Sequence, residues 1–219
     1  MIFYFLKAGG IVMIPLLILA ITALAITIDK ILLFHNLARI PQKLVDIIEK
    51  YNFDWKLLND NLNKLNSKNY YRKFLSIIIE TKQNELAQHH QNKLDKIPIW
   101  WIESRSSDEA KNIEKKLNQN LWILETIITS SPLLGLVGTI IGMMSSFKII
   151  GNSNIINPTA VTAGVAESLI ATGFGLIIAI IALFAFNFFS RKQDQVIDEM
   201  ERLGSKLIDH IKIDRNLQD

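Results

Sequence analysis

Long apolar runs alternate with charged, polar stretches along this chain. The apolar runs cover residues 11–28, 126–147 and 160–190. The first two contain no charged side chain, and the third contains only Glu167. About 20 consecutive apolar residues span a bilayer as an α-helix. The pattern therefore predicts three transmembrane helices.

The polar stretches between and after these runs also have a helical pattern. Apolar residues recur at helical spacing on both sides of an interruption at residues 66–69. We expect the helix over 108–124 to continue without a break into the second apolar run. We expect another helix to continue out of the third run over 193–212.

Basic residues near the ends of the runs predict the orientation. Lys30, Arg39 and Lys43 follow the first run, and Arg191 and Lys192 follow the third. The N-terminal segment and the 148–159 loop contain one cation each. Cytoplasmic flanks carry the excess of Lys and Arg. The N-terminus is therefore predicted to be external and the C-terminus cytoplasmic.

The alternative for the first run is a secretory signal peptide, because Ala23, Leu24 and Ala25 fit a cleavage pattern. Against it, the residues before the run are themselves apolar, and the run is longer than a usual signal core. We therefore expect the first run to remain as a transmembrane helix.

In chain order the predicted parts are an external N-terminus (1–10), a first transmembrane helix (11–28), a cytoplasmic helical domain (29–122), a second transmembrane helix (123–147), an external loop (148–159), a third transmembrane helix (160–190) and a cytoplasmic helical tail (191–219).

Composition supports this organisation and excludes several function classes. Hydrophobic residues make up 49% of the chain, charged residues only 21%, and the mean hydropathy is +0.23. The absence of Cys excludes disulfides, thiol chemistry and Cys-based metal sites. Acids and bases alternate in the polar segments, so they do not form a nucleic-acid footprint. We find no nucleophile–base pair or phosphate loop, and we predict a protein that is not an enzyme and needs no cofactor.

A metal site is also not expected. His89 and His90 are adjacent, so on a helix they point about 100° apart, and no carboxylate cluster completes a site.

Small residues form stripes along the second and third predicted membrane helices. Gly, Ala and Ser let transmembrane helices approach closely, whereas lipid-facing positions have no need of them. We therefore predict helix packing at these positions. They are Pro132, Gly135, Gly138, Gly142 and Ser146 in the second helix and Ala171 and Gly175 in the third.

Three polar residues within the spans are candidates for an ion pathway. Glu167 lies roughly 10 Å along its helix from the external end, and an acid at that depth is costly unless it faces protein or water. Thr139 and Thr172 lie deeper. Each hydroxyl can either bond back to its own helix or donate to water in a polar lumen. Spacing alone leaves both alternatives open for the threonines.

Two motifs resemble those of the MotA/TolQ/ExbB proton-channel family, and its ExbB branch most of all. The second span reads SPLLGLVGTIIGMM and the third GVAESLIATGFGLIIAII. The family pattern has Ala where this chain has Ser131, Val at Ile140 and Ile-Pro at Ile181 and Ala182. None of these departures touches a candidate pathway residue. The 29–122 segment carries no motif that we can match.

The resemblance implies a role for the candidate residues and a set of partners. Family members form a ring, usually a pentamer, around the single-span helices of an ExbD-like partner that supplies an intramembrane Asp. Together they couple inner-membrane proton flow to a TonB-like protein that drives outer-membrane transporters. The family's conserved threonines fall on Thr139 and Thr172, and its intramembrane glutamate falls on Glu167.

We therefore expect an all-α, three-span protein of the bacterial inner membrane that forms a homo-oligomeric, pentamer-like ring with long cytoplasmic helices. Its expected function is that of the proton-channel subunit of an ExbB–ExbD–TonB-type complex. One alternative is a TolQ-like subunit that energises envelope maintenance. Another is a structural membrane scaffold that conducts no ion, although such a scaffold gains little from Glu167.

Overall fold

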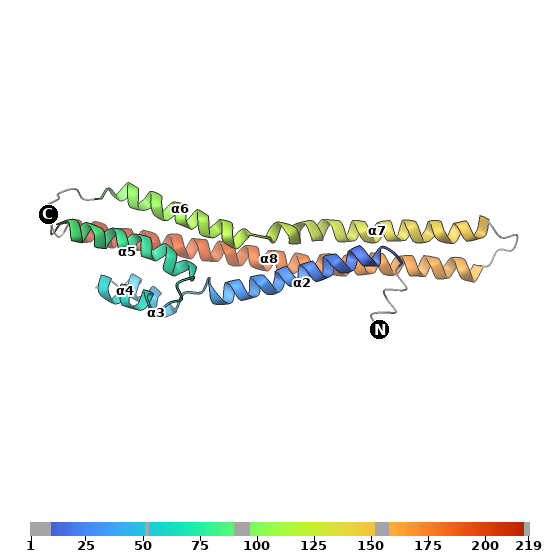
Figure 1. The fold of residues 1–219 in the computed structure, drawn as a ribbon, viewed down its shortest axis with the longest axis horizontal. Coiled ribbons are helices and arrows are strands. Elements are labelled where there is room, and N and C mark those ends of the chain that lie inside the picture. The colour runs from blue at the N-terminus through green and yellow to red at the C-terminus, as the bar shows by residue number, and fades with distance from the viewer. Residues whose placement is uncertain (1–9, 51–52, 90–96, 152–157, 217–219) are drawn as a thin grey trace. The chain divides into compact units, whose positions relative to one another are not determined.

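The computed structural model describes residues 10–50, 53–89, 97–151 and 158–216, and all the regular structure within these ranges is helical. The prediction of an all-α chain is confirmed for these residues (Figure 1). The helices are α2 (Met13–Asn36), α3 (Gln42–Glu49), α4 (Trp55–Leu62), α5 (Tyr70–His89), α6 (Ile99–Asn118), α7 (Leu121–Gly151) and α8 (Pro158–Asn216).

Three helical stretches are long and apolar enough to cross a membrane. They are α2, the stretch Ile99–Phe147, which includes most of α7, and the part of α8 from Gly164 onward. This confirms the prediction of three long apolar helices. The apolar runs produce them because a lipid core leaves the helix as one of the few ways to satisfy every backbone N–H and C=O group.

The chain divides into two compact units, which we describe separately. The first, called the apolar unit below, comprises Met1–Asp29 and Asn120–Ser190. The second, called the polar unit, comprises Lys30–Gln119 and Arg191–Asp219.

In the apolar unit, large aliphatic and aromatic side chains face outward. Ile18, Leu24, Leu133, Met144 and Phe184 are each more than half exposed. Small residues lie instead on the inner side, where α7 and α8 meet. This inside-out distribution is compatible with a surrounding hydrocarbon phase, because lipid tails are as apolar as leucine.

The polar unit has a hydrophobic core of large side chains. Helices α3 to α6 and the C-terminal part of α8 all contribute to it. Its fully buried members include Ile48, Leu58, Leu75, Ile78, Ile102, Ile113, Leu203, Leu207 and Ile211.

Polar contacts fasten α8 to its neighbours in the polar unit. The Trp55 indole N–H donates to Asp214 Oδ2 at 2.7 Å, and Lys82 Nζ lies 3.6 Å from the same oxygen. Lys82 is almost fully buried, so the carboxylate of Asp214 partners a charge that would otherwise be costly to bury. Arg202 binds Glu49 of α3 and, with two hydrogen bonds of 2.8 Å, Glu199 of its own helix.

The predicted interruption at 66–69 is present. Helix α4 ends at Leu62 and α5 begins at Tyr70. The Asn69 side chain accepts a hydrogen bond from the Arg72 N–H at 3.2 Å and donates to the Arg39 carbonyl at 2.9 Å. Asn69 therefore caps the start of α5 and ties it to the segment before α3.

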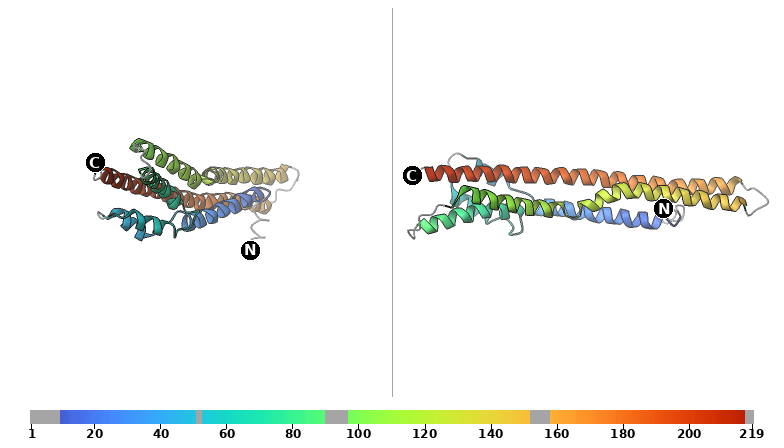
Figure 2. Two further views of the ribbon diagram at one scale, coloured as in Figure 1. Left: turned by 60° about the vertical axis from the view of Figure 1, so that its left-hand side comes forward. Right: turned by 90° about the horizontal axis from the view of Figure 1, so that it is seen from above.

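One predicted helix is continuous and the other is not. α8 runs unbroken through 193–212, as expected (Figure 2). The expectation of a continuous helix over 108–124 is wrong, because α6 ends at Asn118 and α7 begins at Leu121. Between them, Gln119 has an extended ψ of 131° and Asn120 a left-handed φ of 68°.

Candidate functional site

α7 and α8 approach each other closely within the apolar unit. A Cβ atom added to Gly135 would lie 2.8 Å from the Cα of Thr172, and one added to Gly142 would lie 2.6 Å from the Cβ of Ser168. A Cβ on Gly138 would lie 2.8 Å from that of Ala171. No side chain fits at these three positions without moving the helices apart.

The same contact extends to both sides of these glycines. Gly175 of α8 lies against the backbone carbonyl of Ser131, and Gly164 lies against the hydroxyl of Ser146. Residue numbers increase along α7 as they decrease along α8, so the two helices are antiparallel here. Ser131 takes part in the contact although the sequence prediction of packing did not include it. Gly164 and Ser168, which lie on the same four-residue stripe of small residues as Thr172, also take part.

The two candidate threonines donate to neighbouring carbonyls in one turn of α7. Thr172 Oγ1 donates across the helix contact to the Gly135 carbonyl at 2.8 Å. Thr139 Oγ1 donates to the next carbonyl, that of Leu136 in its own helix, at 2.7 Å. In an α-helix the Gly135 carbonyl also accepts the backbone N–H of Thr139. The sequence left open where these hydroxyls would donate, and here one bridges two helices while the other bonds within its own.

The structure gives less detail for two other predicted site residues, Pro132 and Glu167. Pro132 lies inside α7 and is half-buried. Its missing N–H leaves the carbonyl four residues earlier without the usual helical donor. Glu167 belongs to α8, and its side chain lies outside the described residues. The structure therefore brings Thr139 and Thr172 together and gives no side-chain position for Glu167.

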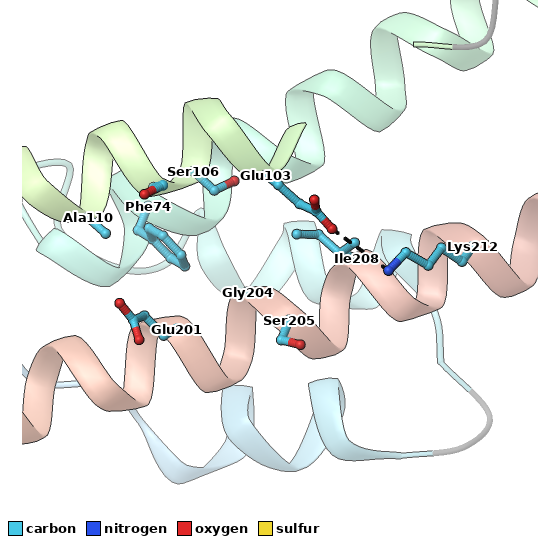
Figure 3. A pocket seen from close by; sticks show the side chains of 10 residues that line it. Phe74, Glu103, Ser106, Ala110, Glu201, Gly204, Ser205, Ile208 and Lys212 are labelled. Carbon is cyan, nitrogen blue, oxygen red and sulfur yellow. Dashed lines mark ion pairs between the residues drawn. The ribbon is translucent and has the colours of Figure 1, made fainter. Parts of the chain in front are cut away.

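A pocket of about 280 Å³ lies in the polar unit, between α5, α6 and α8 (Figure 3). Phe74, Ala110 and Ile208 supply apolar lining, and Glu103, Glu201 and Lys212 supply charge. Lys212 Nζ lies 3.8 Å from Glu103 Oε1 and 3.6 Å from Asp209 Oδ1. Among the residues that the structure describes, no group of three His, Cys, Asp or Glu side chains could hold a metal ion. His90 lies outside the described residues.

Glu49 and Tyr71 are among the described groups of the polar unit with shifted pKa values. The hydrogen bond from Arg202, assisted by the charge of Lys206, lowers the pKa of Glu49 below its ordinary value. Burial raises the pKa of Tyr71 well above the ordinary range of a phenol, and the charge of Glu199 adds to the shift. Neither group lies at the α7–α8 contact, so the pKa shifts identify no reactive side chain there.

Lys30 is a residue whose role the sequence did not reveal. We read it only as one of the cations that follow the first apolar run. In the structure it is 1% exposed, and its Nζ donates to the Leu117 carbonyl at 2.5 Å. The partner is 87 residues away in sequence, so local pattern gave no signal for this bond.

Comparison with known proteins finds one matching family model and several relatives. The model of the MotA/TolQ/ExbB proton channel family matches residues 63–202. A putative biopolymer transport protein ExbB-like 3 from Synechocystis is 32% identical over 185 residues, which are 83% of this chain and 81% of that protein. The chain belongs to the MotA/TolQ/ExbB proton channel family.

Other relatives of this proton channel family match over shorter lengths. The biopolymer transport protein ExbB of Aquifex aeolicus is 38% identical over 87 residues, which cover 39% of this chain and 59% of that protein. The Tol-Pal system protein TolQ of Pseudomonas aeruginosa is 40% identical over 84 residues, 38% of this chain and 36% of that protein. The chain is therefore ExbB-like, with TolQ also among its relatives.

Membership of this family establishes the broad functional class of the protein. The family consists of proton channel proteins rather than enzymes, so the expectation that the chain is not an enzyme is confirmed. Together with the three candidate spans, it makes the chain a multi-pass membrane protein.

Proposed function

We propose that this chain is the proton-conducting subunit of an ExbB–ExbD–TonB-type complex in a bacterial inner membrane. It assembles as a ring of identical copies, with five as the expected number. The ring surrounds a single-span partner that carries an intramembrane Asp. Proton flow down the gradient then drives a TonB-like protein and, through it, outer-membrane transport.

The observation that supports this proposal most directly is the turn of α7 that carries both threonine hydroxyls. Thr139 and Thr172 donate to the neighbouring carbonyls of Leu136 and Gly135. Both belong to the motifs by which the chain resembles the family. A hydroxyl bonded to a carbonyl can rotate to donate to water or to accept from it, so this turn can exchange protons with a partner carboxylate that enters the ring.

We propose that Glu167 completes the pathway. The chain has one acid within its predicted spans, which is too few for a relay of carboxylates, so the partner Asp is needed. Several copies of Glu167 in one ring would repel one another, and like charges disfavour ionisation. Some copies would then be neutral or be stabilised by hydroxyls and lumen water.

The test is proton-gradient-driven transport by single variants. Thr139→Val, Thr172→Val and Glu167→Ala should each abolish transport while the protein still inserts and assembles with its partner. Val keeps the shape of Thr and removes its hydroxyl. Thr22→Val is the matched control, because the Thr22 hydroxyl bonds to the carbonyl of Ile18 in its own helix on α2. Normal transport by all three assembled variants would refute the ion-path proposal and favour a non-conducting scaffold.

The scaffold is the alternative that the Thr172–Gly135 bond favours, because that bond by itself gives Thr172 a packing role. The scaffold alternative predicts that Thr172→Val loses assembly and not only transport.

A TolQ-like role is favoured by the 40% identity to the Pseudomonas protein. Co-purification of the full chain distinguishes the two roles by the single-span partner and the energised protein that accompany it. Recovery without any single-span protein bearing an intramembrane Asp would contradict both.

The proposed topology has an external N-terminus and a cytoplasmic C-terminus. A reporter fused after residue 219 or inserted near residue 66 should therefore be cytoplasmic, and one near residue 154 external. An external signal near residue 66 would overturn this topology and revive the signal-peptide alternative.

A further inference from the structure

Lys30 bonds to the end of α6, and both lie in the polar unit. Lys30 lies in the last part of α2 and is one of the largest fully buried side chains described. An ammonium group is costly to bury unless hydrogen bonds replace its water. The Leu117 carbonyl, in the last turn of α6, accepts one such bond at 2.5 Å.

The Leu117 carbonyl lies next to the break between α6 and α7. In an uninterrupted α-helix it would accept the backbone N–H of Leu121. In the structure Leu121 is instead the first residue of α7, and the ammonium of Lys30 donates to that carbonyl. Lys30 therefore supplies a donor to a carbonyl that the break leaves without its helical donor.

The local sequence carries only the weaker helix-stop signals at this place, Asn120 and the two lysines of the last turn. Residues 115–125 contain no Gly and no Pro, the residues that most often end a helix. The backbone nevertheless leaves the helix at Gln119, with ψ 131°, and enters the left-handed region at Asn120, with φ 68°. Asn tolerates this region better than most residues but gains nothing from it by itself. A distant group that bonds to this helix end adds to these local signals.

The cationic environment at the end of α6 fits the same role. Lys115 and Lys116 lie in its last turn and are exposed, while Lys30 supplies an ammonium from the buried side. Positive charge at a helix C-terminus interacts favourably with the helix dipole. Of these three lysines, Lys30 is the one that donates to the Leu117 carbonyl, which would accept the Leu121 N–H in a continuous helix.

We propose that Lys30 is a positioning residue that keeps α6 and α7 as two helices, and that withdrawing its ammonium from the Leu117 carbonyl allows one helix to form across the break. This gives the chain a two-state element at residues 118–121. The further statement that the break is needed for proton-driven work rests on the proposed function.

The first test measures the geometry of the break. The chain has no Cys, so the pair Lys111→Cys and Glu125→Cys, both at exposed positions, can carry spin labels in the full-length protein. In one continuous helix their Cα atoms would be about 21 Å apart. Lys30→Met should raise the population at this spacing relative to the parent, and Lys30→Arg, which keeps a cationic donor, should lower it again.

A matched control separates the bond from the loss of charge. Lys116→Met removes an exposed cation from the same helix end and should leave the distance distribution unchanged. If Lys116→Met and Lys30→Met alter the distribution equally, general electrostatics explain the break and the proposal is wrong.

A second variant serves if Lys30→Met fails to fold. Asn120→Ala keeps Lys30 but replaces the residue that adopts the left-handed conformation, so it should shift the distribution in the same direction. In a population with one helix, the Leu121 amide becomes hydrogen-bonded and should exchange more slowly, by about tenfold or more where that state dominates. Unchanged distances and unchanged Leu121 exchange in Asn120→Ala and in any folded Lys30→Met would overturn the proposal.

Transport is measured last, on the same variants. Loss of transport in assembled Lys30→Met, with recovery in Lys30→Arg, would link the break to the proposed function. Altered distances with normal transport would support the structural role of Lys30 and refute the link to proton-driven work.

Discussion

Different kinds of side chain stabilise the interior of each of the two units. In the apolar unit, glycine and serine lie at the α7–α8 contact while leucine, isoleucine and phenylalanine face outward. In the polar unit, large apolar side chains fill the core and the exposed positions are mostly charged or polar. α8 shows both arrangements along one continuous helix.

The difference follows from the solvent each part is suited to. In water, burying large apolar side chains is the main stabilising contribution, so a core of leucine and isoleucine is effective. Between lipid-embedded helices there is no such driving force, and close backbone approach with interhelical hydrogen bonds replaces it. The same helix can therefore need Leu203 inside at one end and Gly175 inside at the other.

The largest expected effect compares two leucines of α8. Leu203 is fully buried in the polar unit, whereas Leu176 is 47% exposed in the apolar unit. Leu203→Ala should destabilise the polar unit by about 2–5 kcal/mol, because it removes buried methyl groups and leaves a cavity. Leu176→Ala should change little. Denaturant unfolding in detergent, followed by the fluorescence of Trp55 and its neighbours in the polar unit, measures both, and similar losses would contradict the contrast.

The next effect compares two glycines of the apolar unit. Gly142 has no room for a side chain against Ser168, whereas a Cβ on Gly173 would meet nothing within 4 Å. Gly142→Leu should force α7 from α8 at a cost of roughly 1–3 kcal/mol or more and reduce the oligomer recovered in mild detergent. Gly173→Leu is the control for size and hydrophobicity. Wild-type recovery from Gly142→Leu would show that the α7–α8 contact does not carry assembly.

A smaller effect separates the two threonines of the candidate site. Thr172→Val removes a bond between helices and should lower stability by about 0.6–2 kcal/mol. Thr139→Val removes only a bond within α7 and should cost less. Thermal unfolding of the two variants in the same detergent gives the difference. Equal melting temperatures would mean that the Thr172–Gly135 bond adds nothing to helix association.

The smallest expected effect is the pH dependence of an exposed ion pair in the polar unit. The pKa of Glu49 is lowered in the folded chain, mainly by its hydrogen bond from Arg202. Its stabilising contribution is therefore fully present above the ordinary carboxyl pKa of 4.5 and is lost as the pH falls through the lowered value.

Melting temperatures of the wild type and Glu49→Gln should accordingly converge as the pH falls from 7 to 3. Because Glu49 is exposed, only a small difference is expected at neutral pH. Asp60→Asn, at an exposed acid on α4, controls for removal of a negative charge. A gap between wild type and Glu49→Gln that widens in acid would contradict the assigned pairing.

Much of this protein follows from the sequence. The three apolar runs predict the three long helices because a lipid core demands about 20 uncharged residues for each crossing. The motifs around Thr139 and Thr172 indicate the family, which the match over residues 63–202 then shows. The small-residue stripes also identify where close helix contact is possible, since only small residues permit it.

Tertiary structure decided the contacts that distant segments make. Periodicity placed Thr172 on a polar stripe, but only the position of α7 shows that its hydroxyl reaches the Gly135 carbonyl. Similarly, residues 108–124 are predicted to form one helix because they contain no Gly or Pro, yet the helix breaks at Gln119 and Asn120. The carbonyl that would continue that helix accepts from Lys30, 87 residues away. A sequence pattern predicts which backbone groups lie near one another along a helix. It does not predict which distant side chain forms hydrogen bonds with them.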